Sequence, residues 1–322
     1  MRQKALRLYD QLFEGVSKIV LLDVPDYPNV GDSAIFVGLM NYFRHKGIDV
    51  EMASSIDTLN HKFTSQAETV VLLGGGSFGG LYPVSDEHRI FVMSLRSPDA
   101  LFIQCPQSIH FVSDEFENQI CEALAMLKNR RVSVRDKESQ VRLSKNGIDA
   151  KLLPDSSIFL TPSDFALPDS KVIPGSVVYL VRQDGEALYE FAGSVDAKWL
   201  SDGILLRVTS KLRKLGRYAD SIANLLNPTP RRWEKIARKR LERGRKILGN
   251  AEIVVTDRLH GMILALLAGK KVVALDNSNF KLSRYSQIWL DSEPNLLFVR
   301  SLDDVESIIT QLLQVKNQRN GH

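Results

Sequence analysis

The sequence is poor in the residues that build disulfide frameworks and zinc sites. Its 322 residues include only two cysteines, Cys105 and Cys121, and no spacing of cysteine and histidine resembles a zinc site. Cys105 lies inside an apolar run of strand type, which favours a buried reduced thiol over a disulfide. We therefore expect no bound metal and a protein of the reducing cytoplasm.

Long apolar segments are also missing. No run approaches the roughly 20 residues that a bilayer span requires, and the N-terminal MRQKALRLYDQLF predicts an amphipathic helix rather than a signal peptide. With 44% hydrophobic and 25% charged residues, the composition is typical of a globular protein. The net charge of +4 suits an anionic small molecule or an acidic surface, but it is too small to indicate nucleic acid by itself.

Short apolar runs alternate with segments of helical periodicity along most of the chain. Strands are expected within residues 18–24, 48–54, 69–83, 100–111, 131–136, 150–160 and 176–186, with 204–210 as a further candidate, and a strand–turn–helix–strand unit is expected over 252–277. Strands that alternate with helices indicate parallel α/β sheets that are covered on both faces.

The length exceeds the size at which single hydrophobic cores stop growing, so two domains are expected. The segment 161–175 carries three prolines and a glycine and is the candidate linker. We therefore predict an N-terminal domain over 1–165 and a C-terminal domain over 166–322, which closes with a helix at about 303–317.

Polar and glycine-rich clusters fall where the expected strands end. They lie at residues 28–33, 74–83, 106–110, 135–136, 154–156, 182–186 and 256–260. Ligands of open α/β sheets bind beyond the carboxyl ends of the strands. Two such edges that face each other would form a cleft between domains, which is a common place for a small-molecule site.

The cluster TDRLHG stands between an apolar strand and an apolar helix. Helix N-termini bind anions, Arg258 adds a planar fork for a carboxylate or phosphate, and His260 can exchange a proton near neutral pH. Thr256 or Asp257 is expected to cap the helix. The alternative is structural: Arg258 pairs with Asp257 or another acid, and His260 only packs.

The segment LLGGGSFGGLYP does not match the Walker pattern, and it is not a clean dinucleotide fingerprint because no helix clearly follows it. Its glycines, Gly75 and Gly76 among them, allow a ligand to lie against the main chain or simply form a tight turn. Gln107, Ser108 and His110, in PQSIHF, offer hydrogen-bonding groups that suit a sugar, or they belong to a loop that only packs.

Acids and a further arginine stand at other strand ends. Asp32 is a candidate for orienting a ligand hydroxyl, or for capping a helix that begins near Ser33. Arg135 is a candidate second anion clamp, with a surface pair between Arg135 and Asp136 as the alternative. Asp155 is either a ligand contact or a helix cap.

A basic helix is expected over residues 231–246. Its cations are Arg231, Arg232, Lys235, Arg238, Lys239, Arg240, Arg243, Arg245 and Lys246, against Glu234 and Glu242. Such a run is either a solvated face or a surface for an anionic partner such as the inner face of a membrane. Aromatic residues for base stacking are missing around it, so we expect no nucleic acid.

The motifs NVGDSAI, LLGGGSFGGLYP, PQSIHF, SVRDKES, LPDSSIF and VVTDRLHGMILALLAGKKVVALDN occur in this order. Together they resemble the polysaccharide pyruvyl transferase family, especially its bacterial exopolysaccharide members, over residues 18–290. The resemblance implies two Rossmann-like α/β domains with parallel sheets facing a cleft, as in glycosyltransferases of the B type, with the acceptor on the N-terminal side.

The resemblance also implies transfer of pyruvate from phosphoenolpyruvate to a sugar, usually as a ketal, with release of phosphate and without a cofactor. The implied donor-binding residues are Arg258, Leu259 and His260 together with an upstream arginine, for which Arg135 is the first choice and Arg182 the second. His260 is the first candidate for acid–base work, and Asp32, Asp136 or Asp155 is expected to activate the sugar hydroxyl. The implied acceptor-binding residues are Asp32, Gly75, Gly76, Gln107, Ser108, His110 and Asp155.

Two other functions fit the same architecture. One is a glycosyltransferase that uses a nucleotide sugar, and the other is a non-catalytic protein that binds glycans. For the pyruvyl transferase function, the expected acceptor is a sugar or a lipid-linked oligosaccharide. The basic helix 231–246 is expected to contact the anionic inner membrane surface from the cytoplasm.

Overall fold

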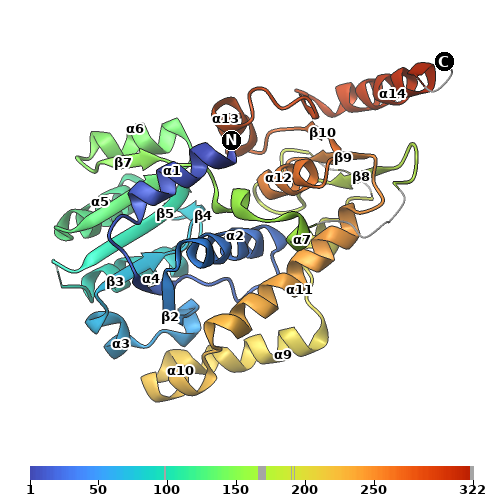
Figure 1. Ribbon diagram of the computed structural model, residues 1–322. Helices are drawn as coiled ribbons and strands as arrows, with labels where there is room; N and C mark the ends of the chain where they lie inside the picture. Colours follow the sequence, from blue (N-terminus) through green and yellow to red (C-terminus); the bar gives the residue numbers. More distant parts are fainter. Residues whose placement is uncertain (98, 166–171, 190, 192, 320–322) are drawn as a thin grey trace. The chain divides into compact units, whose positions relative to one another are not determined.

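The computed structural model describes residues 1–97, 99–165, 172–189, 191 and 193–319 (Figure 1). It contains two sheets in which every strand pairs in parallel, and both are accompanied by helices. The expected parallel α/β class is therefore confirmed. None of the described helices has both the length and the apolar composition that crossing a membrane requires.

The described chain separates into two compact units. The first contains Met1–Pro28, Asp32–Leu160 and Asp202–Lys239, and the second contains Asn29–Gly31, Thr161–Ser201 and Arg240–His322. A single cut between residues 165 and 166 would place 202–239 in the second unit, whereas this segment groups with the first. Part of the expected linker, 166–171, lies outside the described residues.

The first unit is built on a seven-stranded sheet in the order β2-β1-β3-β5-β6-β7, with β4 paired to β5. Its strands are β1 (Lys18–Leu22), β2 (Asp49–Ala53), β3 (Thr69–Leu72), β4 (Gly75–Phe78), β5 (Leu101–Ile109), β6 (Arg130–Val134) and β7 (Ala150–Leu152). Strand β3 is buried along its whole length, as expected where helices cover both faces of a sheet.

Helices and 3-10 turns surround this sheet. They are α1 (Arg2–Leu12), α2 (Val30–Lys46), η1 (Ile56–Thr58), α3 (His61–Gln66), α4 (Pro83–Ser94), α5 (Asp114–Met126), α6 (Lys137–Lys145), η2 (Ser156–Phe159), α9 (Ile204–Arg213), η3 (Lys214–Tyr218), α10 (Asp220–Leu226) and the first half of α11 (Pro230–Leu248). The amphipathic helix expected at the N-terminus is confirmed as α1, which buries Ala5, Tyr9 and Leu12.

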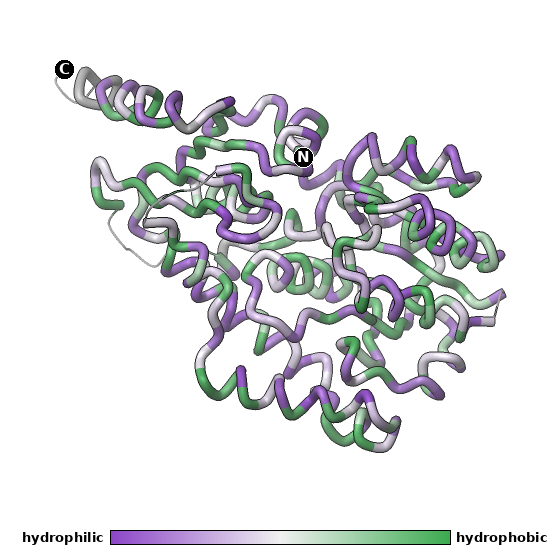
Figure 2. Tube along the Cα trace, turned by 180° about the vertical axis from the view of Figure 1, so that it is seen from behind, coloured by the Kyte–Doolittle hydropathy of each residue, from purple (hydrophilic) through white to green (hydrophobic). Residues whose placement is uncertain are grey.

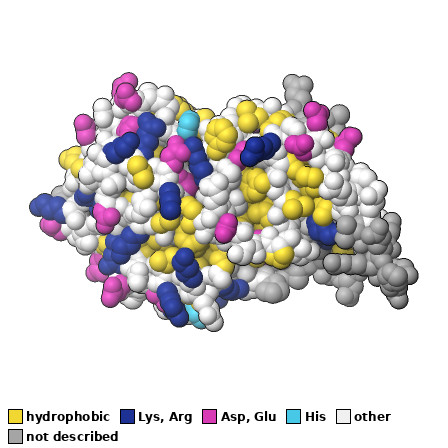
Figure 3. Space-filling view, turned by 90° about the horizontal axis from the view of Figure 1, so that it is seen from above, with side chains coloured by type: hydrophobic (Ala, Val, Ile, Leu, Met, Phe, Trp, Pro, Cys, Tyr) yellow, Lys and Arg dark blue, Asp and Glu magenta, His cyan; other side chains and the backbone are white. Residues whose placement is uncertain are grey.

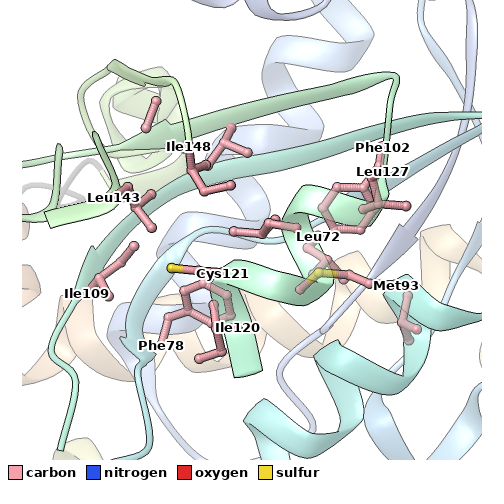
Figure 4. Packing of buried hydrophobic residues seen from close by; sticks show 14 of the residues in the cluster. Leu72, Phe78, Met93, Phe102, Ile109, Ile120, Cys121, Leu127, Leu143 and Ile148 are labelled. Carbon is pink, nitrogen blue, oxygen red and sulfur yellow. The ribbon is translucent and has the colours of Figure 1, made fainter. Parts of the chain in front are cut away.

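The core of the first unit lies between its strands and the helices α4, α5 and α6. Figure 4 shows Leu72, Phe102 and Ile109 from the strands beside Met93 from α4 and Cys121 from α5. Both cysteines are buried and free, so the expected reduced thiol is confirmed for Cys105. Burial raises the pKa of the Cys121 thiol to about 11, which keeps it protonated and unreactive.

The second unit is built on a four-stranded sheet in the order β11-β10-β9-β8. Its elements are α7 (Pro162–Phe165), β8 (Val177–Leu180), α8 (Asp196–Trp199), β9 (Ile253–Thr256), α12 (Leu259–Leu267), β10 (Lys271–Ala274), α13 (Lys281–Trp289), β11 (Leu296–Phe298) and α14 (Leu302–Arg319). Helix α14 packs Val305 and Ile309 against Ile253 and Val273 of the sheet. The closing helix expected at about 303–317 is therefore confirmed.

Two local expectations are wrong. Residues 204–210 form helix α9 rather than a strand. A helix, α4, does follow the glycine-rich segment. The strand expected within 100–111 is confirmed as β5, so the alternative in which Gln107 and Ser108 belong to a packing loop does not hold.

The basic helix expected over 231–246 is confirmed as part of α11, but many of its cations are used inside the protein. Arg240 is fully buried, and Arg238 pairs with Glu234 at 2.7 Å. Arg245 pairs with Glu242, and Arg243 donates to the carbonyl oxygen of Trp199 at 3.0 Å. The expected contact of this helix with a membrane therefore rests on fewer cations than its sequence shows.

Candidate functional site

The junction between β9 and α12 holds the TDRLHG motif in the second unit. The hydroxyl of Thr256 donates to the carbonyl oxygen of Leu180 at 2.7 Å and accepts from the N–H of Arg258 at 3.0 Å, which ties the end of β9 to β8. Gly261 is required here, because a Cβ atom would lie 2.6 Å from the Thr256 hydroxyl oxygen. Close packing at this junction therefore fixes the position of the first turn of α12 relative to β8 and β9.

The N-cap residue of α12 is Arg258, and no side chain caps the helix. The expectation that Thr256 or Asp257 caps it is therefore wrong. The Thr256 oxygen is taken by the N–H of Arg258, which precedes the helix, and one carboxylate oxygen of Asp257 is taken by another strand end. The N-terminus of α12 therefore carries no side-chain cap hydrogen bond, and helix N-termini bind anions.

Arg258 is buried and paired with Asp196, the first residue of α8. Its Nε donates to Asp196 Oδ1, and its Nη2 donates to Asp196 Oδ2 at 2.9 Å and to Asp184 Oδ2 at 3.4 Å. The expected alternative, in which Arg258 pairs with an acid, is thus what the structure shows. The pairing uses one edge of the guanidinium, and Nη1 makes no hydrogen bond to a described residue. Asp196 therefore orients the fork and leaves Nη1 as a donor.

Arg182 lies at the carboxyl end of β8 and joins the same network. Its Nε and Nη2 each donate to a carboxylate oxygen of Asp184 at 2.8 Å, and it also pairs with Glu186. Burial would raise the pKa of Asp184, but the hydrogen bonds and charge of Arg182 outweigh burial and lower it. Asp184 therefore stays ionised between the guanidinium groups of Arg182 and Arg258.

Glu186 extends the network toward α13. It accepts a hydrogen bond from Asn279 at 2.6 Å and pairs with Lys281. Burial opposes ionisation of Glu186, yet the charges of Lys281 and Arg182 lower its pKa. The sequence reasoning missed Asp184, Asp196, Glu186 and Lys281, although 182–186 was marked as a polar strand end.

Asp257 is fully buried below this network. One carboxylate oxygen accepts the N–H of Arg182 at 2.8 Å, and the other has no hydrogen-bond partner among the described residues. Burial raises the pKa of Asp257 to about 6. The sequence named Asp257 only as a cap or an ion-pair partner. It is in fact a carboxyl group that can bind a proton near neutral pH, a property typical of functional sites.

His260 lies in the first turn of α12, half-buried, against the backbone of Gly31. A Cβ atom at position 31 would lie 2.7 Å from Nδ1 of His260. Two motifs that are 229 residues apart, NVGD and RLHG, therefore meet in the second unit. Leu259, between the arginine and the histidine, is buried.

Helix α2 begins at Val30, and the side chain of Asn29 accepts the N–H of Gly31 at 2.8 Å. The expectation that the helix begins near Ser33 with Asp32 as its cap is therefore wrong. Asp32 lies inside the first turn, partly exposed, and its carboxylate accepts a hydrogen bond from the hydroxyl of Tyr27, which helps to raise the pKa of that hydroxyl.

Arg135, the first choice for the upstream anion clamp, is buried in the first unit. Its Nε donates to Ser108 Oγ at 2.8 Å, and its Nη1 pairs with Asp155 at 2.7 Å. The alternative of a surface pair between Arg135 and Asp136 is wrong, because the partner is Asp155 and the pair is buried. Asp155 also caps η2 by accepting the N–H of Ser157 at 3.0 Å.

Asp136 is the N-cap of α6 and accepts the N–H of Ser139 at 2.8 Å. Gln107 is buried within β5, where its amide donates to the carbonyl oxygen of Leu73 at 3.1 Å while its own oxygen has no partner among the described residues. His110 is exposed just beyond β5. Arg135 thus lies close to Gln107 and Ser108, whereas the carboxylate of Asp136 caps helix α6.

The glycine-rich segment divides into two parts. Gly75 and Gly76 belong to β4, and a Cβ atom at Gly75 would lie 3.6 Å from the side-chain oxygen of Gln107. Gly79 and Gly80, with φ of +126° and +100°, donate their N–H groups to the carboxylate of Asp86 at 3.2 and 2.6 Å. The structural alternative therefore holds for Gly79 and Gly80, whose amides are occupied by an internal anion.

Asp23, which the sequence reasoning missed, lies at the carboxyl end of β1. Its backbone is left-handed, with φ of +64°, which is rare for a residue other than glycine. One carboxylate oxygen accepts from Nε of Arg89 at 2.5 Å, and the other has no partner among the described residues. An acid directly after an apolar strand was the available signal, but the marked cluster began at residue 28. Such strain is common at functional sites.

The described residues contain no group of three His, Cys, Asp or Glu side chains arranged to hold a metal ion. The structure brings Arg182, Arg258, Leu259 and His260 together in the second unit. It brings Gly75, Gln107, Ser108, Arg135 and Asp155 together in the first.

Comparison with known proteins gives consistent matches. A profile described as polysaccharide pyruvyl transferase matches residues 29–279. A Bacillus subtilis protein named as a pyruvyl transferase, EpsO, is 28% identical over 324 residues, or 96% of each chain. Pyruvyl transferase 1 of Schizosaccharomyces pombe is 27% identical over 297 residues, 88% of this chain and 72% of that protein.

A solved structure shares the architecture. The crystal structure of KP1_0663, a functionally uncharacterized protein from Klebsiella pneumoniae, matches with a TM-score of 0.67 at 20% identity and covers 94% of this chain and 99% of that one. At this identity the likeness shows the fold alone. The profile match spans both the Asn29–Gly31 segment and the β9–α12 junction.

Proposed function

We propose, from the premise that the chain belongs to the polysaccharide pyruvyl transferase family, that it transfers pyruvate from phosphoenolpyruvate to a glycan. The product is a ketal that bridges two sugar hydroxyls. The first sugar hydroxyl gives its proton to a base as its oxygen bonds to C2 of the donor, while C3 takes a proton from an acid. Phosphate then leaves C2, the second sugar oxygen bonds there, and its proton is released.

The donor carries a carboxylate and a phosphate, so it needs more than one cationic or N–H donor. The observation that carries the proposal is the arrangement at the β9–α12 junction. Asp196 holds Arg258 by one edge, Nη1 stays without a partner among the described residues, and the first turn of α12 has no side-chain cap. Nη1 and this turn are the groups proposed to bind the donor.

The proton for C3 needs an acid that is protonated near neutral pH. We assign this role first to His260, which stands in the same first turn of α12 and is held in place by the backbone of Gly31. Asp257 is the second candidate, because burial raises its pKa to about 6 and leaves one oxygen without a partner among the described residues. Protonation of Asp257 would also reduce the negative charge that the donor meets.

The residues proposed for the sugar lie in the first unit. Gln107 has a side-chain oxygen without a partner among the described residues, and His110 is exposed beside it in the chain. Asp136 and Asp155 already accept helix N–H groups. We propose Asp32, which lies partly exposed in the first turn of α2, as the base for the sugar hydroxyl.

The test is a reaction of the purified protein with phosphoenolpyruvate and a panel of sugars. Inorganic phosphate and the mass of the sugar are measured in the same samples, and the expected result is one phosphate released for each pyruvyl group gained. Turnover only with a nucleotide sugar would instead identify a glycosyltransferase. Sugar binding without any consumption of phosphoenolpyruvate would identify a glycan-binding protein.

A further inference from the structure

Helix α9 in the first unit turns its apolar side away from the protein. Ile204, Leu205, Val208 and Leu212 are all exposed, and Leu205 keeps 69% of its surface accessible. With about 100° of rotation per residue, these four side chains fall within an arc of about 100° on one side of the helix. This is the reverse of an ordinary surface helix, which buries its apolar side.

The polar side of α9 is the one that is attached to the protein. Ser210 donates to the carbonyl oxygen of Asp26 at 2.9 Å, and the buried guanidinium of Arg213 makes two hydrogen bonds to the Asp26 carboxylate at 2.7 and 2.6 Å. Arg213 also lies over the ring of Trp233, 5.1 Å from its centroid. These buried contacts fix the orientation of the helix. The outward direction of its apolar side chains is therefore set by specific contacts on its polar side.

The apolar surface continues into η3 and α10. Leu215, Tyr218, Ile222 and Leu225 are exposed there, and Tyr218 and Leu225 keep 76% and 83% of their surface accessible. Figure 1 shows α9 and α10 along the lower edge of the view, and the same edge alternates between hydrophobic and hydrophilic residues in Figure 2. We call the exposed apolar side chains of residues 204–225 the outward patch.

Side-chain contacts also attach η3 and α10 to residues 57–61 of the first unit. Asp220 pairs with His61 at 2.7 Å, and Asn60 donates to Asn224 at 2.5 Å. Arg217 pairs with Asp57 of η1. The outward patch is therefore presented by elements that are anchored along their inner side at both ends.

Cations border the outward patch. On α9, Arg207 and Lys211 lie next to the apolar arc, and Lys214 follows at the start of η3. All three are exposed and form no ion pair with any described residue. By contrast, on the face shown in Figure 3 Lys and Arg side chains are interspersed with Asp and Glu. The border of the outward patch thus carries positive charge that acids of the described chain leave unneutralised.

We propose that the outward patch docks the protein on an anionic lipid surface. Outward aliphatic side chains with Lys and Arg at the border are the signature of a helix that lies in the membrane interface, and Tyr218 suits the headgroup level. A second copy of the chain fits less well, because a twofold interface would add the same three cations from the other copy and no acids to neutralise them. Phosphates of the lipid headgroups would neutralise Arg207, Lys211 and Lys214.

This proposal differs from the sequence-based expectation that the basic helix α11 meets the membrane. Four of the cations of α11 are buried or engaged with other groups of the protein, and Trp233 and Leu241 of α11 are buried. Apolar insertion therefore belongs to α9, η3 and α10. The proposal goes beyond the pyruvyl transfer proposed above and does not depend on it.

The test is co-sedimentation of the full chain with phosphatidylcholine vesicles, with and without about 30 mol% phosphatidylglycerol. We expect binding to the anionic vesicles and a loss of binding as salt rises from about 0.1 to about 0.5 M. The pair Lys211→Glu and Lys214→Glu should weaken binding at least about 25-fold, at roughly fivefold for each charge. The pair Leu205→Gln and Leu212→Gln should weaken it at least about tenfold.

The matched control is the pair Val141→Gln and Lys145→Glu on α6, an exposed apolar residue and an exposed cation elsewhere in the first unit. It should change vesicle binding by less than about twofold. Absence of binding to anionic vesicles, or binding that the patch variants leave unchanged, overturns the proposal. So does concentration-dependent dimerisation that the Leu205→Gln and Leu212→Gln pair abolishes, because a second copy would then cover the patch. Transfer to a soluble sugar should be unchanged in all variants, which separates this test from that of the reaction.

Discussion

The close approach between Gly31 and His260 can be tested by adding a single methyl group. A Cβ atom at position 31 would lie 2.7 Å from Nδ1 of His260 and 2.8 Å from its Cβ, whereas real Cβ contacts essentially never fall below 3.0 Å. In Gly31→Ala the imidazole must therefore move by several tenths of an ångström, or the start of α2 must move by the same amount.

The expected effects on stability and activity differ in size. Gly31 lies in the first turn of α2, where alanine is favoured over glycine by about 0.5–1 kcal/mol. Overpacking by one methyl group costs about 1–3 kcal/mol, so the free energy of unfolding should fall by no more than about 2.5 kcal/mol. Catalysis is more sensitive to position, since a shift of about 1 Å can cost roughly 100-fold. We expect kcat to fall about 10- to 100-fold.

The assay is phosphate release from phosphoenolpyruvate in the presence of a sugar acceptor, and urea unfolding gives the stability of the same samples. Gly203→Ala is the control, because a Cβ atom there meets no heavy atom within 4 Å. Full activity of Gly31→Ala at unchanged stability would show that the position of the imidazole does not matter, and His260 would then lose its assigned role in proton transfer.

Three further predictions concern Arg258, Asp257 and Gly79. Arg258→Lys keeps the charge but loses the two-pronged pairing with Asp196, so kcat/KM for phosphoenolpyruvate should fall at least about tenfold, while Arg300→Lys on the surface should leave it unchanged. The pKa of Asp257 is about 6 in the folded protein, against 3.8 for an ordinary aspartate, so the folded protein holds this proton more tightly than the unfolded chain. The wild type should therefore lose about 3 kcal/mol of stability as pH rises from about 4 to about 7. Urea unfolding of Asp257→Asn should lack this loss, and parallel pH profiles of the two proteins would contradict the raised pKa. Gly79→Ala, whose Cβ atom would lie 2.3 Å from a backbone oxygen at φ of +126°, should lower the free energy of unfolding by about 3 kcal/mol or more, against about 1 kcal/mol for Gly147→Ala in open space.

Local sequence signals predicted most of the regular elements. The strand–turn–helix–strand unit over 252–277 was predicted as it is found. A short apolar run, a polar junction and an apolar helix can each be identified from a few consecutive residues. The helix N-caps were less predictable. Asp155 is a cap, as one of its two interpretations held, and Asp136 is a cap that the sequence reasoning did not predict. Asp32 and Asp257 are not caps. A capping residue and a residue of the first turn look alike when the start of the helix is uncertain by two positions.

The misread helix α9 shows where local reasoning fails for a physical reason. ILLRVTS is rich in β-branched and apolar residues and fits a short buried strand. The structure makes it a helix whose polar side is bound by Asp26, 184 to 187 residues earlier, while its apolar side stays exposed. A pattern rule that assumes apolar residues face inward cannot predict this arrangement.

The sequence by itself determined the parallel α/β class, the order of most elements and the family, since these depend on patterns that extend over a few residues or on motifs in a fixed order. The tertiary structure alone decided which charges meet. Arg258 pairs with Asp196 rather than Asp257, Arg135 with Asp155 rather than Asp136, and the backbone of Gly31 lies against His260. Because an ion pair or a close contact depends on distance in space and leaves no trace in spacing along the chain, these partners could be found only once the strands had been brought side by side.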